Sequence, residues 1–318
     1  MQMILNELSA RFPVESTEKG RQLMDQFLTT CFEVKDIIHN DSILLDQDYR
    51  SFELAPNYRI EQWRNDSAVD VENKRRFRTL LNKSVVYLSE EFEREQEWDF
   101  RTEFQHKEYV SKGCLLAYES DGVAVSFLSS EHWKIPEIEG IYTELVEDGE
   151  LRESQVKIPN VSFDENVRIF RNWYDHKKEE YRYTDIVCGQ DILSCAEDMF
   201  PNLVFCENAI HGCRRNVGIS EAGQVYRRLL ELQRAAEAMG EKFDKNILTN
   251  ATLESGVTLD RFAEEHTFLL PEGETQLFSW HIRYTGGYAG RIFFHPVPGK
   301  KIIYIGHVGH KLPTVRYH

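Results

Sequence analysis

Apolar side chains recur three or four positions apart along residues 16–38, and this spacing places them on one stripe of a helix. The stripe consists of Leu23, Phe27, Cys31 and Val34. Residues 67–93 and the highly charged residues 162–185 are two further helix candidates. We therefore predict three helices in the first half of the chain.

Between the second and third of these helices, the pattern changes to one typical of strands. Residues 113–130 favour a strand on each side of Asp121-Gly122, and residues 141–158 repeat that arrangement around Asp148-Gly149. Asp-Gly between alternating apolar residues is a strong signal for a two-residue hairpin turn. The first half is therefore predicted to be α+β, with at least two β-hairpins.

The second half opens with a short predicted strand in residues 201–209, which continues into a polar turn or helix. Residues 220–240 give the clearest helix of the chain, because Ser220 is a suitable N-cap and Gly240 a suitable end. The predicted buried stripe consists of Val225, Leu229, Leu232 and Ala236.

Three further strands are predicted after a looser connection over residues 241–275. They are residues 276–284, 291–295 and 301–309. The Pro-Gly step in residues 297–300 favours a tight turn between the last two. The predicted order is strand, helix, helix and an antiparallel sheet, which again belongs to the α+β class.

The length of 318 residues fits two ordinary domains, and 41% hydrophobic residues fit a folded chain. We assign residues 1–185 to an α+β domain with a regulatory or partner-binding role, and residues 200–318 to a second domain. No window approaches the ~18 apolar residues of a membrane span, and the start lacks a signal peptide's apolar core. Six cysteines without a CxxC pair read as reduced thiols. We expect a cytoplasmic protein that does not bind membranes.

Charge is divided unevenly between the two halves. Residues 1–199 carry 24 Lys and Arg against 41 Asp and Glu, whereas residues 200–318 carry 14 against 12. After Glu274 there is no acidic residue, although the whole chain has a net charge of -15. A basic segment of this kind attracts phosphate locally, while the net charge discourages general nucleic-acid binding.

The basic residues of this last segment fall on the predicted strands. Alternation places His281 and Arg283 on one face, Arg291 begins the next strand, and Lys311 follows the last one. Neighbouring strands lie about 5 Å apart, so these side chains can converge. A metal-dependent nuclease needs carboxylate ligands. A metal-free ribonuclease needs a base, an acid and cations for the phosphate, and these residue types suffice. We expect no metal and no cofactor.

Two segments of the second half resemble the RelE/ParE toxin superfamily. They are FCENAIHGCRRNVGISEAGQVYRRLLELQRAAEAMG and HIRYTGGYAGRIFFHPVPGKKIIYIGHVGHKLPTVRY, within residues 203–318. Family members have two basic residues at positions i and i+2 on the strand after the helices, an arginine in the next strand, and a "V-G-K/H-R-x₅-Y" ending. The resemblance implies two helices packed against an antiparallel sheet. RelE-type members cut mRNA on the ribosome without a metal, and ParE-type members poison DNA gyrase.

The resemblance also implies the roles of individual residues. The catalytic set would be His281, Arg283, Arg291, Lys311 and Tyr317. From the residue types themselves, and not from the resemblance, we assign nucleic-acid binding to His310, Arg316, Trp280 and Tyr288. In the first set the cations would hold phosphate and a histidine or lysine would act as the base, and in the second the aromatic rings would stack on unpaired bases. The chain departs from the family in the loop TGGYAG, in the lysine at the terminal arginine position, and in an apparent insertion over residues 241–275.

We therefore expect a toxin-like, metal-independent endoribonuclease that cleaves RNA, including mRNA on the ribosome, in bacterial stress response or antiphage (antiviral) defence. A regulatory partner such as an ATPase or an antitoxin would accompany it. The alternative is a non-catalytic subunit of a defence or toxin complex, whose basic sheet docks nucleic acid or an acidic protein.

Three weaker motifs suggest other chemistries. Arg171, Asn172 and His176 resemble the R-N-x-x-x-H signature of HEPN ribonucleases, although a surface helix explains them equally. Glu33-Val34-Lys35 matches part of a PD-(D/E)xK nuclease motif, but lies in a predicted helix instead of a strand. The cysteine pairs are seven residues apart, wider than zinc sites prefer.

Overall fold

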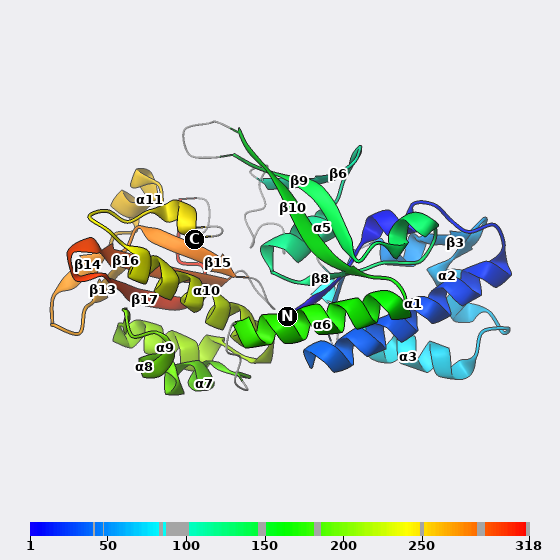
Figure 1. Cartoon of the computed structure of the whole chain (residues 1–318), viewed down its shortest axis with the longest axis horizontal. Helices are drawn as coiled ribbons and strands as arrows, with labels where there is room; N and C mark the ends of the chain where they lie inside the picture. The colour runs from blue at the N-terminus through cyan, green and yellow to red at the C-terminus, as the bar shows by residue number, and fades with distance from the viewer. Residues whose placement is uncertain are drawn as a thin grey trace. The chain divides into compact units, whose positions relative to one another are not determined.

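The computed structural model describes residues 1–40, 42–46, 48–82, 85–86, 102–145, 151–180, 186–248, 251–284 and 290–315. The chain divides into two compact units, Met1–Glu179 and Glu180–His318, each with its own hydrophobic core (Figure 1). The structure is mixed α/β with several sheets, consistent with the predicted α+β class. No described helix combines the length and apolar character that a membrane span requires.

Unit 1 is built on a sheet of eight described strands in the order β5-β2-β1-β8-β10-β9-β6-β7. The strands are β1 (Met3–Leu5), β2 (Ile43–Leu45), β5 (Val85–Val86), β6 (Thr102–His106), β7 (Tyr109–Val110), β8 (Val123–Val125), β9 (Glu137–Leu145) and β10 (Leu151–Val161). Neighbouring strands from β5 to β10 are parallel, and those from β10 to β7 are antiparallel. For the sheet of this unit, the sequence had predicted antiparallel hairpins and had not predicted the parallel strands.

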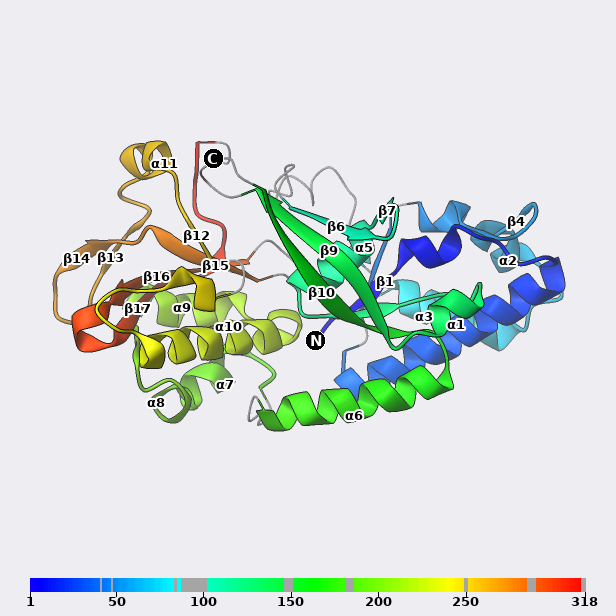
Figure 2. The same cartoon turned by 45° about the horizontal axis from the view of Figure 1, so that its top comes forward.

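Helices cover both faces of this sheet. The helices of unit 1 are α1 (Thr17–Ile38), α2 (Ile60–Asn65), α3 (Val71–Asn82), α5 (Lys112–Glu119) and α6 (Asp164–Glu180); β3 (Glu53–Ala55) and β4 (Tyr58–Arg59) form a separate ribbon. Met3 and Leu5 pack in a core with α1, α3 and α6, whereas Ile4 faces the other way, toward α5. Figures 1 and 2 show α6 running beside α1. Strand alternation thus separates two cores.

The predicted strand at the start of residues 113–130 is wrong, because this stretch forms helix α5. The Ser111 side chain caps the helix by accepting a hydrogen bond from the Cys114 N–H (2.9 Å). Asp121 adopts a left-handed conformation (φ 53°), and the Gly122 N–H donates to Ala117 O (2.7 Å). Asp-Gly therefore ends a helix here and does not join two strands. The second predicted hairpin is confirmed as β9 and β10; its turn, with Asp148-Gly149, lies outside the described residues.

The predicted helices of unit 1 agree with the structure over the described residues. Residues 16–38 correspond to α1 and residues 162–185 to α6, of which residues 181–185 are not described. Residues 67–93 contain α3 but also the strand β5, and their remaining positions include undescribed ones.

Unit 2 contains a five-stranded sheet in the order β11-β17-β16-β15-β12. The strands are β11 (Leu203–Phe205), β12 (Ala251–Leu253), β15 (Trp280–Tyr284), β16 (Gly290–Val297) and β17 (Ile302–His310). β11 is parallel to β17, and the other pairs are antiparallel. The helices are α7 (Gly189–Ser194), α8 (Ala196–Met199), α9 (Glu207–Asn216), α10 (Ile219–Ala238) and α11 (Gly256–Arg261).

The two faces of this sheet have different neighbours. Ile282, Ile292 and Ile305 pack in one core with α9 and α10. Phe293 and Tyr304 belong to a second cluster, which includes residues of the hairpin β13 (Thr267–Leu269) and β14 (Thr275–Leu277). The face toward this hairpin is called the covered face below.

The prediction for unit 2 is right in order and wrong in three details. Helix α10 begins at Ile219 with Gly218 as its N-cap, so Ser220 is not the cap; Glu221 Oε2 accepts from the Gly218 N–H (3.0 Å). The stretch 276–284 is not one strand, because β14 and β15 belong to different sheets. The supposed loose connection, residues 241–275, contains β12, α11 and β13.

Candidate functional site

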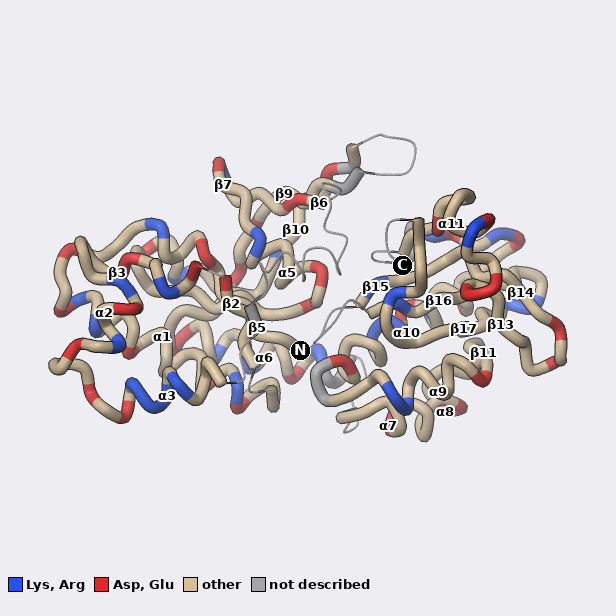
Figure 3. Tube along the Cα trace, turned by 180° about the vertical axis from the view of Figure 1, so that it is seen from behind, with Lys and Arg blue, Asp and Glu red and all other residues tan. Residues whose placement is uncertain are grey.

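The basic residues of β15 and β16 gather on the covered face. Arg283 and Arg291 are direct partners in the antiparallel ladder, and His281 pairs with Phe293. Residues paired in this way point to the same side of a sheet. Ile282 and Tyr284, which alternate with them, face the helices. The predicted alternation of His281 and Arg283 therefore agrees with the structure. Figure 3 shows Lys and Arg positions on β15 and on the neighbouring α10, which packs against the other face of this sheet.

The segment around β12 supplies polar partners for His281. Thr252 is the ladder partner of His281, and its Oγ1 lies 2.8 Å from His281 Nε2. Glu254 Oε1 lies 3.2 Å from His281 Nδ1, which is an ion-pair distance, although the angle is not that of a hydrogen bond. A carboxylate thus stands beside the cations, in contrast to the carboxylate-free site that the sequence predicted.

The residues after β17 close the site from another side. His266, which follows α11, places Nε2 3.0 Å from Pro313 O and packs its ring edge-on against Phe293. Lys311 lies on this terminal stretch and is 7% exposed. Arg291 is 1% exposed and His281 is 5% exposed, whereas Arg283 is half-buried. The cations are therefore inside the unit in this conformation.

Burial lowers the pKa of His281 well below its usual value of 6.5, because a charged imidazole loses its hydration there. Nearby Arg291, Arg283, Lys311 and His266 lower the pKa of His281 further through charge repulsion. Each of these four residues therefore lies within electrostatic reach of His281. His281 is neutral at pH 7 and can accept a proton there.

The charges of this cluster suit an anion. Like charges directly opposite in a ladder, such as Arg283 and Arg291, destabilise a sheet. Buried cations also lose their hydration, and compensation requires an anion close to them. Glu254 is the carboxylate that the described residues place against His281. A phosphate group in the same position would neutralise more charge and form bidentate contacts with arginine.

The remaining predicted site residues do not join this cluster within the described parts of the chain. Trp280 is on the opposite face, where its ring stacks on Phe294 (centroids 6.2 Å apart) and meets Phe243 edge-on. His310 is exposed at the end of β17, opposite Gly290. Three others lie outside the described residues: Tyr288, Arg316 and Tyr317.

The sequence missed Thr252, Glu254 and His266, which all belong to the stretch interpreted as a loose connection. β12 is only three residues long, and so short a strand gives no readable alternation. The Ser255 cap of α11 was a usable signal, since its side chain accepts from the Thr258 N–H (3.2 Å).

The structure does not bring the residues of the weaker motifs together in a site. Arg171, Asn172 and His176 are exposed on α6, and Glu33-Val34-Lys35 lies on helix α1. All six cysteines are free thiols. Across the described parts of the chain, no three His, Cys, Asp or Glu side chains are grouped so as to hold a metal ion.

In unit 1, the carboxyl ends of β1 and β8 form the position where open α/β sheets usually bind ligands. Here the protein's own side chains fill that position. Asn6 Nδ2 donates to Ser126 Oγ (2.9 Å), and Ser126 Oγ donates to Asn160 Oδ1 (2.6 Å). All three residues are buried, so this network stabilises the sheet and leaves the covered face of unit 2 as the better candidate site.

No family model, curated protein or solved structure matches this chain.

Proposed function

We propose that unit 2 is a metal-independent, toxin-like endoribonuclease of the RelE type that cleaves RNA, including mRNA on the ribosome. The position of Arg283, Arg291 and Lys311 near His281 supports this proposal most directly. The same chemistry fits a bacterial stress-response or antiphage role with an ATPase or antitoxin partner, which rests on the family resemblance alone.

In this mechanism the arginines and Lys311 bind the scissile phosphate and stabilise the charge of its pentavalent transition state. Neutral His281 accepts the proton of the ribose 2′-hydroxyl. The attacking 2′-oxygen forms a bond to phosphorus, and the bond to the 5′-oxygen breaks. A protonated cation of the cluster or water returns a proton to that leaving oxygen.

Because the cluster is buried, the proposed reaction requires a conformational change that lets RNA reach it. His281 and Arg291 are at most 5% exposed, and both nitrogens of His281 face protein groups, Thr252 Oγ1 and Glu254 Oε1. RNA therefore reaches the cluster only when the stretch that contains Glu254 and His266 moves away and leaves Lys311 in place. A partner or the ribosome would supply the binding energy for this change.

The same observation favours a second candidate function. If the cover stays in place, His281 has no nitrogen for a substrate proton, and unit 2 is a non-catalytic subunit that docks nucleic acid or an acidic protein partner. The cations would then have a structural role with Glu254. The two candidates differ in whether RNA is cut.

The test is cleavage of labelled single-stranded RNA and of mRNA on translating ribosomes, in EDTA, by the full chain. Arg283→Met/Arg291→Met removes two charges with little change in side-chain length. Lys300→Met/Lys301→Met removes two charges at the exposed turn between β16 and β17 and is the matched control. We expect EDTA-resistant cutting that falls at least 100-fold in the arginine variant and not in the control. Absence of cutting on both substrates, or equal cutting by both variants, contradicts the nuclease proposal.

A further inference from the structure

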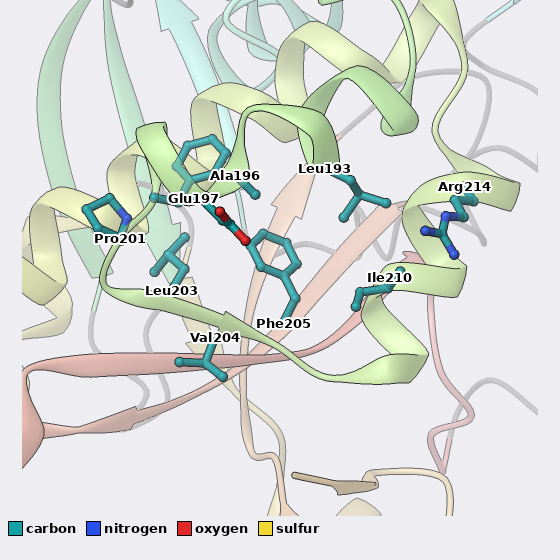
Figure 4. A pocket seen from close by; sticks show the side chains of 10 residues that line it. Leu193, Ala196, Glu197, Pro201, Leu203, Val204, Phe205, Ile210 and Arg214 are labelled. Atoms are coloured by element: carbon teal, nitrogen blue, oxygen red, sulfur yellow. The ribbon is translucent and has the colours of Figure 1, made fainter. Parts of the chain in front are cut away.

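A hollow of about 550 Å³ lies beside strand β11 in unit 2 (Figure 4). Its walls come from α7, α8, β11 and α9, and its lining is mainly apolar, with Leu193, Ala196, Phe205 and Ile210 around its centre. These four side chains are half-buried. Apolar surface gathered in a concave place on a protein often marks an interaction site.

Strand β11 is at the edge of its sheet, with β17 on one side. Asn202 O accepts from the Ile303 N–H, and the Cys206 N–H donates to Ile305 O, both at 2.9 Å. Positions 202, 204 and 206 therefore direct their backbone groups toward β17, whereas Leu203 O and the Phe205 N–H point outward. The Leu203 N–H is already donated to Phe200 O (2.9 Å). The Leu203 carbonyl and the Phe205 N–H therefore point away from β17, along the hollow.

Two exposed charges of opposite sign lie at different ends of the hollow. Figure 4 shows Glu197 on the side of Pro201 and Leu203, and Arg214 beside Ile210. Arg214 is held in place by donation from Nε to Gln190 Oε1 (3.2 Å). A surface with opposite charges at its two ends is complementary to itself after a two-fold rotation.

We propose that β11 pairs antiparallel with β11 of a second copy of this chain, about a two-fold axis at Val204. The Phe205 N–H of each copy then donates to Leu203 O of the other. The rotation brings Glu197 of each copy to Arg214 of the other, and the apolar walls of α8 and α9 pack across the axis. The two five-stranded sheets become one continuous sheet.

Charge complementarity is what favours a second copy as the occupant. An isologous interface repeats each contact, so one Glu197–Arg214 match is used twice. Pairing also satisfies the outward backbone groups of an edge strand, which otherwise remain open to unwanted association. An unrelated extended peptide would gain the backbone bonds, but nothing on this surface requires it to carry both charges.

The test is the mass of the full chain in solution by light scattering after size exclusion, over a hundredfold range of concentration. We expect a species of about twice the 37.3 kDa chain mass. Arg214→Glu and Glu197→Arg each place like charges together twice, so each weakens dimerisation about tenfold or more. The double variant Arg214→Glu/Glu197→Arg exchanges the two charges, so it restores the attraction between the two copies. Arg215→Glu, on the same helix but outside the hollow, is the matched control.

Rescue by the double variant excludes misfolding as the cause of the single effects, because it contains both substitutions. Hydrogen exchange gives an independent readout, since the Phe205 amide becomes protected as the concentration rises. A monomer at every concentration overturns the proposal. A dimer that neither reversal weakens overturns it too, and then an unrelated surface makes the contact.

Discussion

The carboxylate of Glu254 is expected to hold the cation cluster together, and Glu254→Gln tests this with little change in volume. The Glu254 side chain is 11% exposed and lies 3.2 Å from His281 Nδ1. A charge about 7 Å from the carboxylate, the diagonal spacing between neighbouring strands, sets the scale of its electrostatics. At an effective dielectric constant of about 20, each cation at that distance attracts a carboxylate by about 2 kcal/mol.

The nearby cations contribute to this attraction by amounts that fall with their distance, and the desolvation of the carboxylate offsets part of it. The expected net loss in Glu254→Gln is about 3 kcal/mol, the usual cost of removing one partner from a buried charge cluster. For a unit of this size the melting temperature falls by about 12 °C.

Differential scanning calorimetry of the full chain measures this change, with Glu265→Gln, an exposed carboxylate of the same segment, as the control. Phosphate provides the diagnostic step, measured on Glu254→Ala, whose missing carboxylate leaves space for an anion. If the vacated position binds phosphate with a Kd of about 1 mM, 100 mM phosphate restores about 2.7 kcal/mol. Sodium chloride of equal ionic strength and the Glu265→Gln variant account for general salt effects.

Two results would refute this reasoning. A melting temperature within about 2 °C of the wild type would mean that the carboxylate does not compensate the cations. A large decrease that phosphate reverses no better than chloride would mean that the cluster does not accept an external anion, and the case for a phosphate site would be lost.

Two further predictions concern the sheet of unit 2. Burial lowers the pKa of His307 to about 4, so the imidazole protonates in the unfolded chain at a higher pH than in the folded one. The contribution of His307 to the free energy of unfolding is present above about pH 6.5 and is lost as the pH falls, and the loss is about 3 kcal/mol at pH 4. In urea titrations, His307→Gln should reduce this dependence of the unfolding free energy on pH. Gly212→Ala should destabilise unit 2 by about 2 kcal/mol or more, because a Cβ there would lie 2.1 Å from Val308 O; chemical denaturation checks this against Gly240→Ala, where nothing lies within 4 Å.

The sequence predicted an element correctly where its spacing of apolar residues matches the face that the element buries in the folded unit. Leu23, Phe27 and Cys31 form a helical stripe and are buried together in one core, so α1 was predictable. In residues 113–119 every apolar residue is buried or half-buried, and a continuous apolar run has no period that separates helix from strand. There the Ser111 side chain caps a helix, and the Asp-Gly step indicated the wrong kind of turn.

The candidate site was predictable as far as it depends on strand alternation. His281, Arg283 and Arg291 share a face because β15 and β16 pair in register. The groups that surround them could not be predicted, because Glu254 and His266 come from a segment whose strands take their register from β15 and the hairpin partner, and not from a pattern of their own. Burial of basic residues is likewise a tertiary property, and composition alone indicated an exposed surface.

The burial that hides His281 also prepares it for the proposed chemistry. Burial is the largest cause of its lowered pKa, and the neighbouring cations are the next. When the cover opens, hydration returns and the first cause weakens, but the repulsion from Arg283, Arg291 and Lys311 remains, so the imidazole is still neutral. A bound phosphate then offsets those cations and raises the pKa of His281. In the proposed reaction, the histidine therefore meets RNA as a base and gains basicity as the phosphate binds, which is the order that abstraction of a 2′-hydroxyl proton requires.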